Sequence, residues 1–301
     1  MTYDCLIIGG GIAGLQAAIQ LGRYDHSIAV IDAGGGRSSL CRNYHNLLGW
    51  PDGVSGDHFR STGQKQAKQF GVHFINDKAI DIKKDQQGFA ITLQDDTICP
   101  KGKTLLFATG ITERLPDLPA LLPCLGHSVY ICPDCDGYEI KQKKTIVIGS
   151  GKAGANLSRA LRYWSDEITF VNHEKINVPD EVVNKLAKEN ITIINEEVKD
   201  VHTKDQSQFT GITLVNGEKI EAFHAFLAMG NNQVNSGLAK RIGVERLENK
   251  HINVNPRTKQ TNIPDVWAVG DVVAHSQLLS VAMGDGAQAA IWIHKRLLQG
   301  R

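Results

Sequence analysis

The sequence lacks a long hydrophobic run. Its apolar stretches, such as residues 7–15, contain glycines and are far shorter than the roughly 20 residues that cross a bilayer. A basic segment followed by an apolar core is also missing at the N-terminus, where Thr2, Tyr3 and Asp4 lead directly into a strand-like run. We therefore expect no membrane segment, no signal peptide and a cytoplasmic location.

Excess charge and abundant cysteine are missing as well. Lys and Arg number 33 and Asp and Glu 32, a formal net charge of +1, which gives no electrostatic reason to expect nucleic acid or an anionic membrane as a partner. Six cysteines in 301 residues do not resemble a secreted disulfide scaffold. Cys5, Cys41, Cys99 and Cys124 are scattered, and Cys5 is expected to be a small buried residue of the first strand.

What the sequence does contain is a repeated plan. Residues 3–8 form an apolar run that enters a glycine cluster and a helix-compatible stretch, and a second apolar run ends at Asp32. The plan recurs with strands at 144–148 and 167–171 around another glycine cluster. Each such βαβ start opens a doubly wound sheet. We therefore predict an α/β protein with two Rossmann-like dinucleotide-binding domains.

The second domain is predicted to be inserted into the first. Apolar runs that end in glycine at 103–110 and 225–230 read as the last strand of each block, and a proline-rich crossing at 115–119 reads as a linker. The tail then returns with a strand-like run at 266–271 and a final helix from about Gly284 to Leu298. The predicted domains are residues 1–114 with 235–301, and residues 115–234.

The first glycine cluster has the spacing of a pyrophosphate-binding turn. Gly9 permits the tight turn, Gly11 lets the backbone approach the pyrophosphate, and Gly14 lets helix and strand pack closely. The helix N-terminus offers free N–H groups to the anion. Asp32 ends the second strand, where a carboxylate can accept hydrogen bonds from ribose hydroxyls. The motif predicts a bound dinucleotide but does not distinguish FAD from NAD.

A second motif is the pair Cys132 and Cys135, three residues apart with Pro133 and Asp134 between them. Two cysteines at this spacing at a helix start can close a short redox-active disulfide. The alternatives are half of a zinc site or idle thiols. Zinc normally needs four ligands, but no second such pair exists and His127 is the only imidazole near in sequence. We predict a redox dithiol and no metal, with Asp136 as a candidate proton donor or a simple helix-start carboxylate.

These motifs together resemble those of a known protein family. The stretch from Cys132 to Glu139, between two dinucleotide folds, is similar to the redox motif of the low-molecular-weight thioredoxin reductases. Residues 46–56 resemble the segment whose asparagine approaches the flavin in that family. Residues 108–110 resemble its strand exit before the hinge, and residues 270–272 its Gly-Asp motif at the ribityl-pyrophosphate end of the flavin. The resemblance covers nearly the whole chain.

The resemblance implies a fold, a cofactor and a mechanism. FAD would lie in the discontinuous first domain, and the second would be NAD(P)-binding-like and carry the dithiol. Cys135 would face the flavin, Cys132 would attack the substrate disulfide, and Asp136 would donate the proton. The inserted domain would rotate between flavin and partner, and the protein would be a homodimer. The residues assigned to FAD are Gly9, Gly11, Gly14, Asp32, Asn46, Gly110, Gly270 and Asp271.

The second glycine cluster departs from that family. Gly149, Gly151 and Gly154 are present, but the arginines that would read the 2′-phosphate of NADPH are replaced by a stretch that contains Glu174. A carboxylate repels a phosphate, and one lysine does not replace bidentate arginines. Glu174 could select NADH, the site could hold another nucleotide such as a second FAD, or it could be vestigial.

A further departure lies before the last helix. Where the family has an Arg-Gln pair near the flavin, this chain has Gln277 and Leu278, so a positive charge near the flavin's pyrimidine edge is expected to be lost. Trp292 and His294 on the last helix could cover the flavin or a dimer contact, although such residues are more often helix surface or core.

These observations leave several functions open. The leading hypothesis is a flavoprotein that reduces a thioredoxin-like protein or a small disulfide, by a route other than the usual NADPH one. One alternative is a dithiol oxidase that uses oxygen to close a disulfide in a small molecule. Another is a diflavin disulfide reductase that takes electrons from ferredoxin. A non-enzymatic FAD-binding sensor would leave the spacing of Cys132 and Cys135 unexplained.

Overall fold

The computed structural model describes residues 2–95 and 99–299, and it divides the chain into two compact units. The first unit comprises residues up to Ser39, Asp57–Thr112 and the chain from Gln233 onward, whereas the second comprises Leu40–Gly56 and Glu113–Asn232. The predicted α/β fold with an inserted second domain is thus confirmed. The predicted domain boundaries stay a prediction, since the units place Leu40–Gly56 with the inserted block.

The first unit is built on a seven-stranded sheet of order β3-β2-β1-β6-β5-β4, with β17 also paired to β6. The strands β1, β2, β3, β6 and β17 run parallel, and β4 and β5 form an antiparallel extension. Their bounds are β1 (Thr2–Ile8), β2 (Ile28–Ile31), β3 (His73–Ile75), β4 (Ala79–Asp85), β5 (Gly88–Leu93), β6 (Lys101–Phe107) and β17 (Val266–Ala268).

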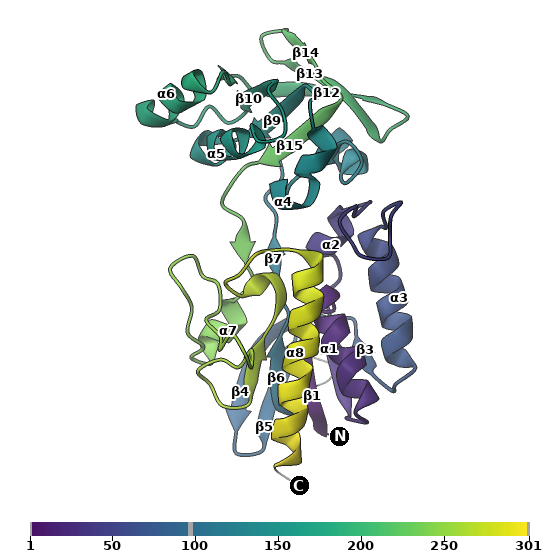
Figure 1. Cartoon of the computed structure of the whole chain (residues 1–301). Coiled ribbons are helices and arrows are strands. Elements are labelled where there is room, and N and C mark those ends of the chain that lie inside the picture. The colour runs from purple at the N-terminus through teal and green to yellow at the C-terminus, as the bar shows by residue number, and fades with distance from the viewer. Residues whose placement is uncertain (1, 96–98, 300–301) are drawn as a thin grey trace. The chain divides into compact units, whose positions relative to one another are not determined.

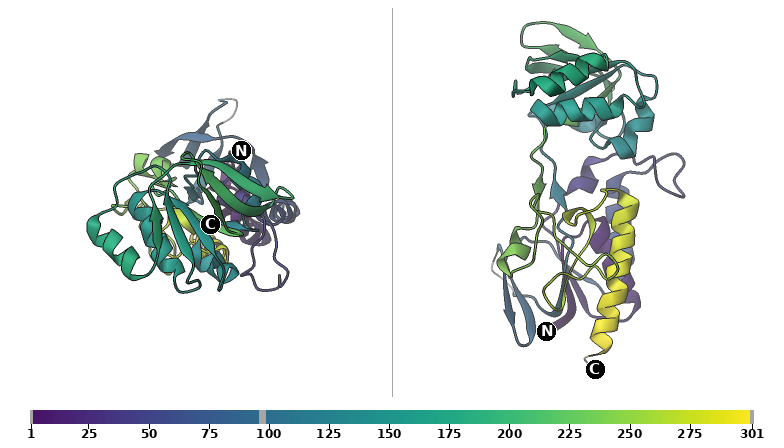
Figure 2. Two further views of the ribbon diagram at one scale, coloured as in Figure 1. Left: turned by 90° about the horizontal axis from the view of Figure 1, so that it is seen from above. Right: turned by 60° about the vertical axis from the view of Figure 1, so that its left-hand side comes forward.

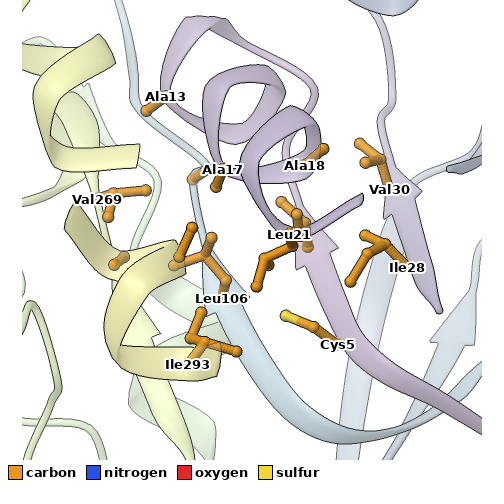
Figure 3. Close-up of a cluster of buried hydrophobic side chains, with 14 of the residues drawn as sticks. Cys5, Ala13, Ala17, Ala18, Leu21, Ile28, Val30, Leu106, Val269 and Ile293 are labelled. Atoms are coloured by element: carbon orange, nitrogen blue, oxygen red, sulfur yellow. The ribbon is translucent and has the colours of Figure 1, made fainter. Parts of the chain in front are cut away.

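Helices cover this sheet. Helix α1 (Ile12–Arg23) follows β1, and the long helix α8 (Leu279–Leu298) lies beside it, as Figure 1 and the right-hand view of Figure 2 show. Side chains from α1, α8 and the sheet meet in one apolar core, which Figure 3 shows around Leu21 and Leu106. The other elements of the unit are α2 (Arg37–Leu40), α3 (Gly56–Lys68), α7 (Gly237–Arg241), the 3-10 turn η3 (Gly270–Val272) and the short antiparallel pair β7 (Ile111–Thr112) and β16 (Gln233–Val234).

The start of α8 corrects the sequence analysis. The helix begins at Leu279 and not at Gly284, so Gly284 and Gly286 lie inside it. A β-carbon on Gly286 would stand 2.3 Å from the backbone oxygen of Ala13. Gly286 is therefore required by the close packing of α8 on α1, whereas a β-carbon on Gly284 would meet nothing within 4 Å.

The second unit repeats the plan on a smaller scale. Its five-stranded sheet has the order β11-β10-β9-β15-β8, and all its pairs are parallel. The strands β9, β10 and β15 are the runs predicted from the second glycine cluster and its last strand. The bounds are β8 (Val129–Tyr130), β9 (Thr145–Gly149), β10 (Ile168–Asn172), β11 (Thr192–Ile194) and β15 (His224–Ala228).

Two layers cover this second sheet. Helices α5 (Gly151–Leu161) and α6 (Asp180–Lys188) contribute to one apolar cluster with Phe170. An antiparallel three-stranded sheet contributes to another with Phe209, so the parallel strands are buried on both faces. The three strands are β12 (Val198–Lys204), β13 (Gln208–Leu214) and β14 (Lys219–Glu221), and the remaining elements are η1 (Pro119–Cys124), α4 (Pro133–Asp136) and η2 (Gly137–Ile140).

None of the helices among residues 2–95 and 99–299 combines the length and the apolar character that a bilayer-spanning segment needs.

Candidate active site

The first glycine turn lies between β1 and α1 and has the shape of a pyrophosphate cradle. Gly9 has φ +106°, and a β-carbon there would stand 2.3 Å from the backbone oxygen of Ala108. A β-carbon on Gly14 would stand 2.0 Å from the oxygen of Gly9, whereas one on Gly11 would meet nothing within 4 Å. Two glycines are thus fixed by packing and the third leaves an open approach, so the residues present fit a dinucleotide.

Asp32 lies directly after β2, as predicted, and is paired with an arginine that the sequence analysis missed. The Nη2 atom of Arg60, on α3, donates to Asp32 Oδ2 at 2.8 Å, and both side chains are mostly buried. A β-carbon on Gly10 would stand 2.8 Å from the same oxygen, so the carboxylate lies against the glycine turn. A carboxylate at this position can accept a hydrogen bond from a ribose hydroxyl.

Gly270 and Asp271 also come to this turn. Gly270 has φ +71°, and a β-carbon on it would stand 2.8 Å from the Cβ atom of Ala13, in the first turn of α1. Asp271 Oδ2 accepts a hydrogen bond of 3.0 Å from Arg37 Nη1. The glycine turn, Asp32 and Asp271 therefore meet at the carboxyl ends of the parallel strands, where open α/β sheets bind ligands.

Asp285, His275 and Lys259 form a buried ionic cluster next to the Gly270 turn, which the sequence did not predict. Asp285 is 4% exposed and accepts hydrogen bonds from His275 Nε2 at 2.6 Å and Lys259 Nζ at 2.7 Å. Burial alone would raise the pKa of Asp285, but these two partners hold it below its usual value. The hydrogen bond to Asp285 in turn raises the pKa of His275. Since the Gly270 amide also donates to Asp285 at 3.2 Å, the cluster fixes the Gly270 turn.

Two other predicted cofactor positions have different surroundings. Gly110 follows β6 with φ +61°, and its carbonyl accepts from the amide of Asn235 at 3.0 Å. Asn46 is exposed and belongs to the second unit, so its approach to the flavin stays a prediction.

On α8, His294 contacts His26 at 2.8 Å and stacks on Tyr24, so it serves the fold of the first unit.

The predicted dithiol lies at the start of α4 in the second unit. Cys132 is the N-cap residue and Pro133 the first helical residue, a place where proline is favoured because its missing N–H would have no helical partner. The amide of Cys135 donates to Cys132 Sγ at 3.2 Å, and both cysteines are half-buried thiols. A backbone donor at a helix N-terminus stabilises negative charge on the sulfur, which is what a nucleophilic thiol needs.

Acidic groups surround this helix. Asp136 follows Cys135 directly and is only 7% exposed. The pKa of the Tyr130 hydroxyl is raised by burial and by the nearby carboxylates of Glu139 and Asp136. The role of Asp136 as proton donor stays a prediction, and Asp134 between the cysteines is exposed.

The other cysteines differ from this pair. Burial raises the pKa of Cys5 to about 12, so this thiol stays protonated, as expected for a buried strand residue. Burial also raises the pKa of Cys124, while Cys99 is exposed and Cys41 half-buried. Within the described residues, no group of three or more histidine, cysteine, aspartate or glutamate side chains is arranged to hold a metal ion.

The second glycine turn, between β9 and α5, differs from the first in its middle glycine. Gly149 and Gly154 are packed against Phe170. Gly151 has φ +50°, and a β-carbon there would stand 2.8 Å from Ile176 Cγ2. The amide of Gly151 donates to Asn172 Oδ1 at 2.9 Å. Where Gly11 is open, Gly151 is covered by a side chain and its N–H already has an acceptor.

Glu174 follows β10, as predicted, and lies in an ion pair. The Nη2 atom of Arg114 donates to Glu174, and its Nη1 atom donates to the carbonyl of Met229 at 3.0 Å. Hydrogen bonding to Ser150 and to Arg114 lowers the pKa of Glu174, so the side chain is a carboxylate at neutral pH. The neighbouring Lys175 is paired with Glu196 at 2.5 Å.

Comparison with known proteins finds similar sequences and folds over nearly the whole chain. The family model "Pyridine nucleotide-disulphide oxidoreductase" matches residues 3–286. A thioredoxin reductase from Streptomyces clavuligerus is 26% identical over 96% of this chain and 92% of its own, and one from Rickettsia bellii is 26% identical over 99% of each. The crystal structure of thioredoxin reductase from Streptococcus pyogenes has the same fold, with a TM-score of 0.86, 22% identity and coverage of 100% of this chain and 99% of its own.

Proposed function

Since this chain belongs to the pyridine nucleotide-disulphide oxidoreductase family, we propose that it passes electrons from FAD to a disulfide between Cys132 and Cys135, and from there to a disulfide substrate. The observation that carries the proposal is the hydrogen bond from the Cys135 amide to Cys132 Sγ at the start of α4. FAD is the cofactor of this flavin-dependent disulfide oxidoreductase. The glycine turn of the first unit, with Asp32 and Asp271, is the place proposed for it.

The proposed reaction is a thiol–disulfide exchange. Cys132, as thiolate, attacks one sulfur of the substrate disulfide, and the other sulfur leaves as a thiolate that takes a proton from Asp136. Cys135 then attacks Cys132, which closes the Cys132–Cys135 disulfide and releases the second substrate sulfur as a thiol. FAD, when bound and reduced, supplies the two electrons that restore the dithiol.

We propose that electrons do not enter by way of NADPH at the second glycine turn. Three features support this: Ile176 covers Gly151, the Gly151 amide donates to Asn172, and Glu174 after β10 is a carboxylate, which would repel a 2′-phosphate. The first two features oppose any dinucleotide pyrophosphate in the usual pose, NADH and a second FAD included. The proposed electron donor therefore acts on the flavin without binding at that turn, as reduced ferredoxin could.

The electron donor can be identified by an anaerobic titration of the purified flavoprotein with NADPH, NADH and reduced ferredoxin, followed by flavin absorbance. We expect NADPH at low micromolar concentration to leave the flavin oxidised. Stoichiometric bleaching by NADPH would overturn this part of the proposal while leaving the disulfide chemistry intact.

A thioredoxin-like protein is the proposed partner, and a cytoplasmic homodimer the proposed form.

The covered Gly151 also favours a second candidate, an oxygen-dependent dithiol oxidase, because such an enzyme needs no pyridine nucleotide. Its electrons flow in reverse, from a small-molecule dithiol through Cys132 and Cys135 to FAD and oxygen. Reduction under anaerobic conditions followed by exposure to oxygen separates the two. Fast flavin reoxidation with peroxide release, coupled to loss of a supplied dithiol, would favour the oxidase.

A further inference from the structure

Arg37 joins two segments of the chain that are far apart in sequence. One nitrogen atom, Nη1, donates to Asp271 Oδ2 at 3.0 Å and to Gln277 Oε1 at 2.9 Å. Gln277 is also in contact with His251, whose Nε2 atom lies 3.3 Å from Gln277 Nε2. An arginine from the beginning of α2 therefore lies beside Gln277, where the sequence predicted the loss of a positive charge.

This arginine stands at the cofactor end of the first unit. Asp271 follows Gly270, which lies against Ala13 in the first turn of α1, the same turn that follows the pyrophosphate cradle. Three consecutive glycines, Gly34–Gly36, all with positive φ, precede Arg37 after Asp32. This sharply turned segment brings the guanidinium from the end of β2 to the loop after β17. Arg37 and Asp271 are about one-fifth exposed, at 22% and 18% of their side-chain surface.

The carboxylate of Asp271 lies in a region that would hold an anionic cofactor. FAD carries a negatively charged diphosphate, and reduction of the flavin can add negative charge. A carboxylate next to the pyrophosphate turn would repel both unless a cation neutralised it. Arg37 is in contact with Asp271, and Lys259 and His275 are already paired with the buried Asp285.

We propose that Arg37 is a positioning residue of the FAD site: it neutralises Asp271 and orients that carboxylate as an acceptor for the cofactor. The inference rests on FAD being the cofactor. It predicts that the flavin's affinity and its reduction potential depend on the charge at residue 37.

A second ion pair at the same turn provides a matched comparison. Arg60 neutralises Asp32 at 2.8 Å, in the same manner as Arg37 neutralises Asp271. Asp32 stands at the end of β2, the place for the adenosine ribose, which is remote from the ring that changes redox state. Loss of Arg60 should therefore weaken FAD binding without changing the potential, whereas loss of Arg37 should change both.

The test uses the full-length protein with FAD removed and added back. The Arg37→Gln variant should bind FAD about tenfold more weakly than the wild type, as expected when one charged contact is lost. Its ratio of reduced to oxidised flavin at a fixed potential should fall about tenfold, which is about 30 mV for a two-electron couple. Arg37→Lys should retain most of both properties, and Arg60→Gln should lose affinity only.

The double variant Arg37→Gln with Asp271→Asn tests whether Arg37 acts by neutralising the charge of Asp271 or only by holding nearby segments in place. If Arg37 acts by neutralising Asp271, removing both charges should restore the potential toward that of the wild type, so the two changes should not be additive. An Arg37→Gln variant with unchanged affinity and potential would overturn the inference, as would a double variant whose potential lies at or below that of Arg37→Gln. Failure of the wild-type protein to bind FAD at all would instead refute the proposed cofactor.

Discussion

Ile176 Cγ2 lies 2.8 Å from the place where a β-carbon on Gly151 would stand, so the middle glycine of the second turn is covered. The corresponding Gly11 of the first turn meets nothing within 4 Å. The two glycine clusters look alike in sequence but differ in what they can bind. This contrast supports the proposal that FAD binds at the first turn and that the second turn does not take a dinucleotide in the usual pose.

Shortening Ile176 should partly reopen the second turn. We expect Ile176→Ala to bind NADH about fivefold to tenfold more tightly than the wild type, about 1 kcal/mol, because the pyrophosphate gains access to the start of α5. Calorimetric titration measures this directly. Val215→Ala is the control, since Val215 is 54% exposed and Ile176 53%. Equal affinities of wild type and Ile176→Ala would mean that Ile176 is not the obstruction.

Asp136 should matter for turnover far more than its neighbour Asp134. Removing a general acid typically slows a reaction by a factor of about 100 or more, so Asp136→Asn should lower kcat with a protein disulfide by about that factor. Asp134 is exposed between the two cysteines, and Asp134→Asn should stay within about twofold of the wild type. Rapid-quench measurement of dithiol oxidation checks the step itself. Equal effects of the two substitutions would remove Asp136 from the proposed proton transfer.

The cluster of Asp285, His275 and Lys259 should contribute strongly to stability. Asp285→Asn leaves Lys259, whose side chain is 12% exposed, without its carboxylate, and breaking a buried pair of this kind costs about 3 kcal/mol. Urea unfolding followed by circular dichroism measures the change. The exposed pair of Arg296 and Asp265, at 2.6 Å, is the control, and Asp265→Asn should cost less than about 1 kcal/mol. Similar costs would show that the cluster is not a structural centre.

His224 should make the second unit sensitive to acid. Burial, with a smaller contribution from Lys143, lowers the pKa of His224 from 6.5 to about 4. Between these pH values the unfolded chain binds a proton that the folded chain does not, so the free energy of unfolding should rise with pH through this range and be lowest below pH 4.

His224→Phe keeps a ring beside Tyr130, on which His224 stacks, and removes the titrating group. The urea midpoint of this variant should therefore vary less between pH 4.5 and 7 than that of the wild type. The exposed His202 serves as the control, since His202→Gln should retain the full dependence on pH. A His224→Phe variant as acid-sensitive as the wild type would assign the effect to other groups.

The sequence predicted what depends on local pattern. Apolar runs before glycine clusters placed β1 and β9, and Cys132 with Pro133 placed the start of α4, because each signal lies within a few neighbouring residues. The insertion of one domain in the other followed from the order of the last strands. Such features depend on chain geometry that the local sequence already determines.

What the sequence could not predict depends on contacts between distant segments. Arg37 and Asp271 are 234 positions apart, and no local pattern joins them. Arg60 on α3 and Ile176 after β10 gave no signal beyond an ordinary helix arginine and an exposed isoleucine. The three glycines before Arg37 were a usable sign, since such a run marks a sharply turned segment. The start of α8 at Leu279 was also missed, since the predicted helix began only at Gly284.

The most direct test of the account is an anaerobic reductive titration of the purified flavoprotein with dithionite. We predict that the wild type takes up twice as much reductant per flavin as the Cys132→Ser variant, since the flavin and the disulfide each accept two electrons. A Cys99→Ser variant, which alters an exposed cysteine outside the pair, should titrate as the wild type does. Equal uptake by wild type and Cys132→Ser would contradict electron exchange between flavin and dithiol.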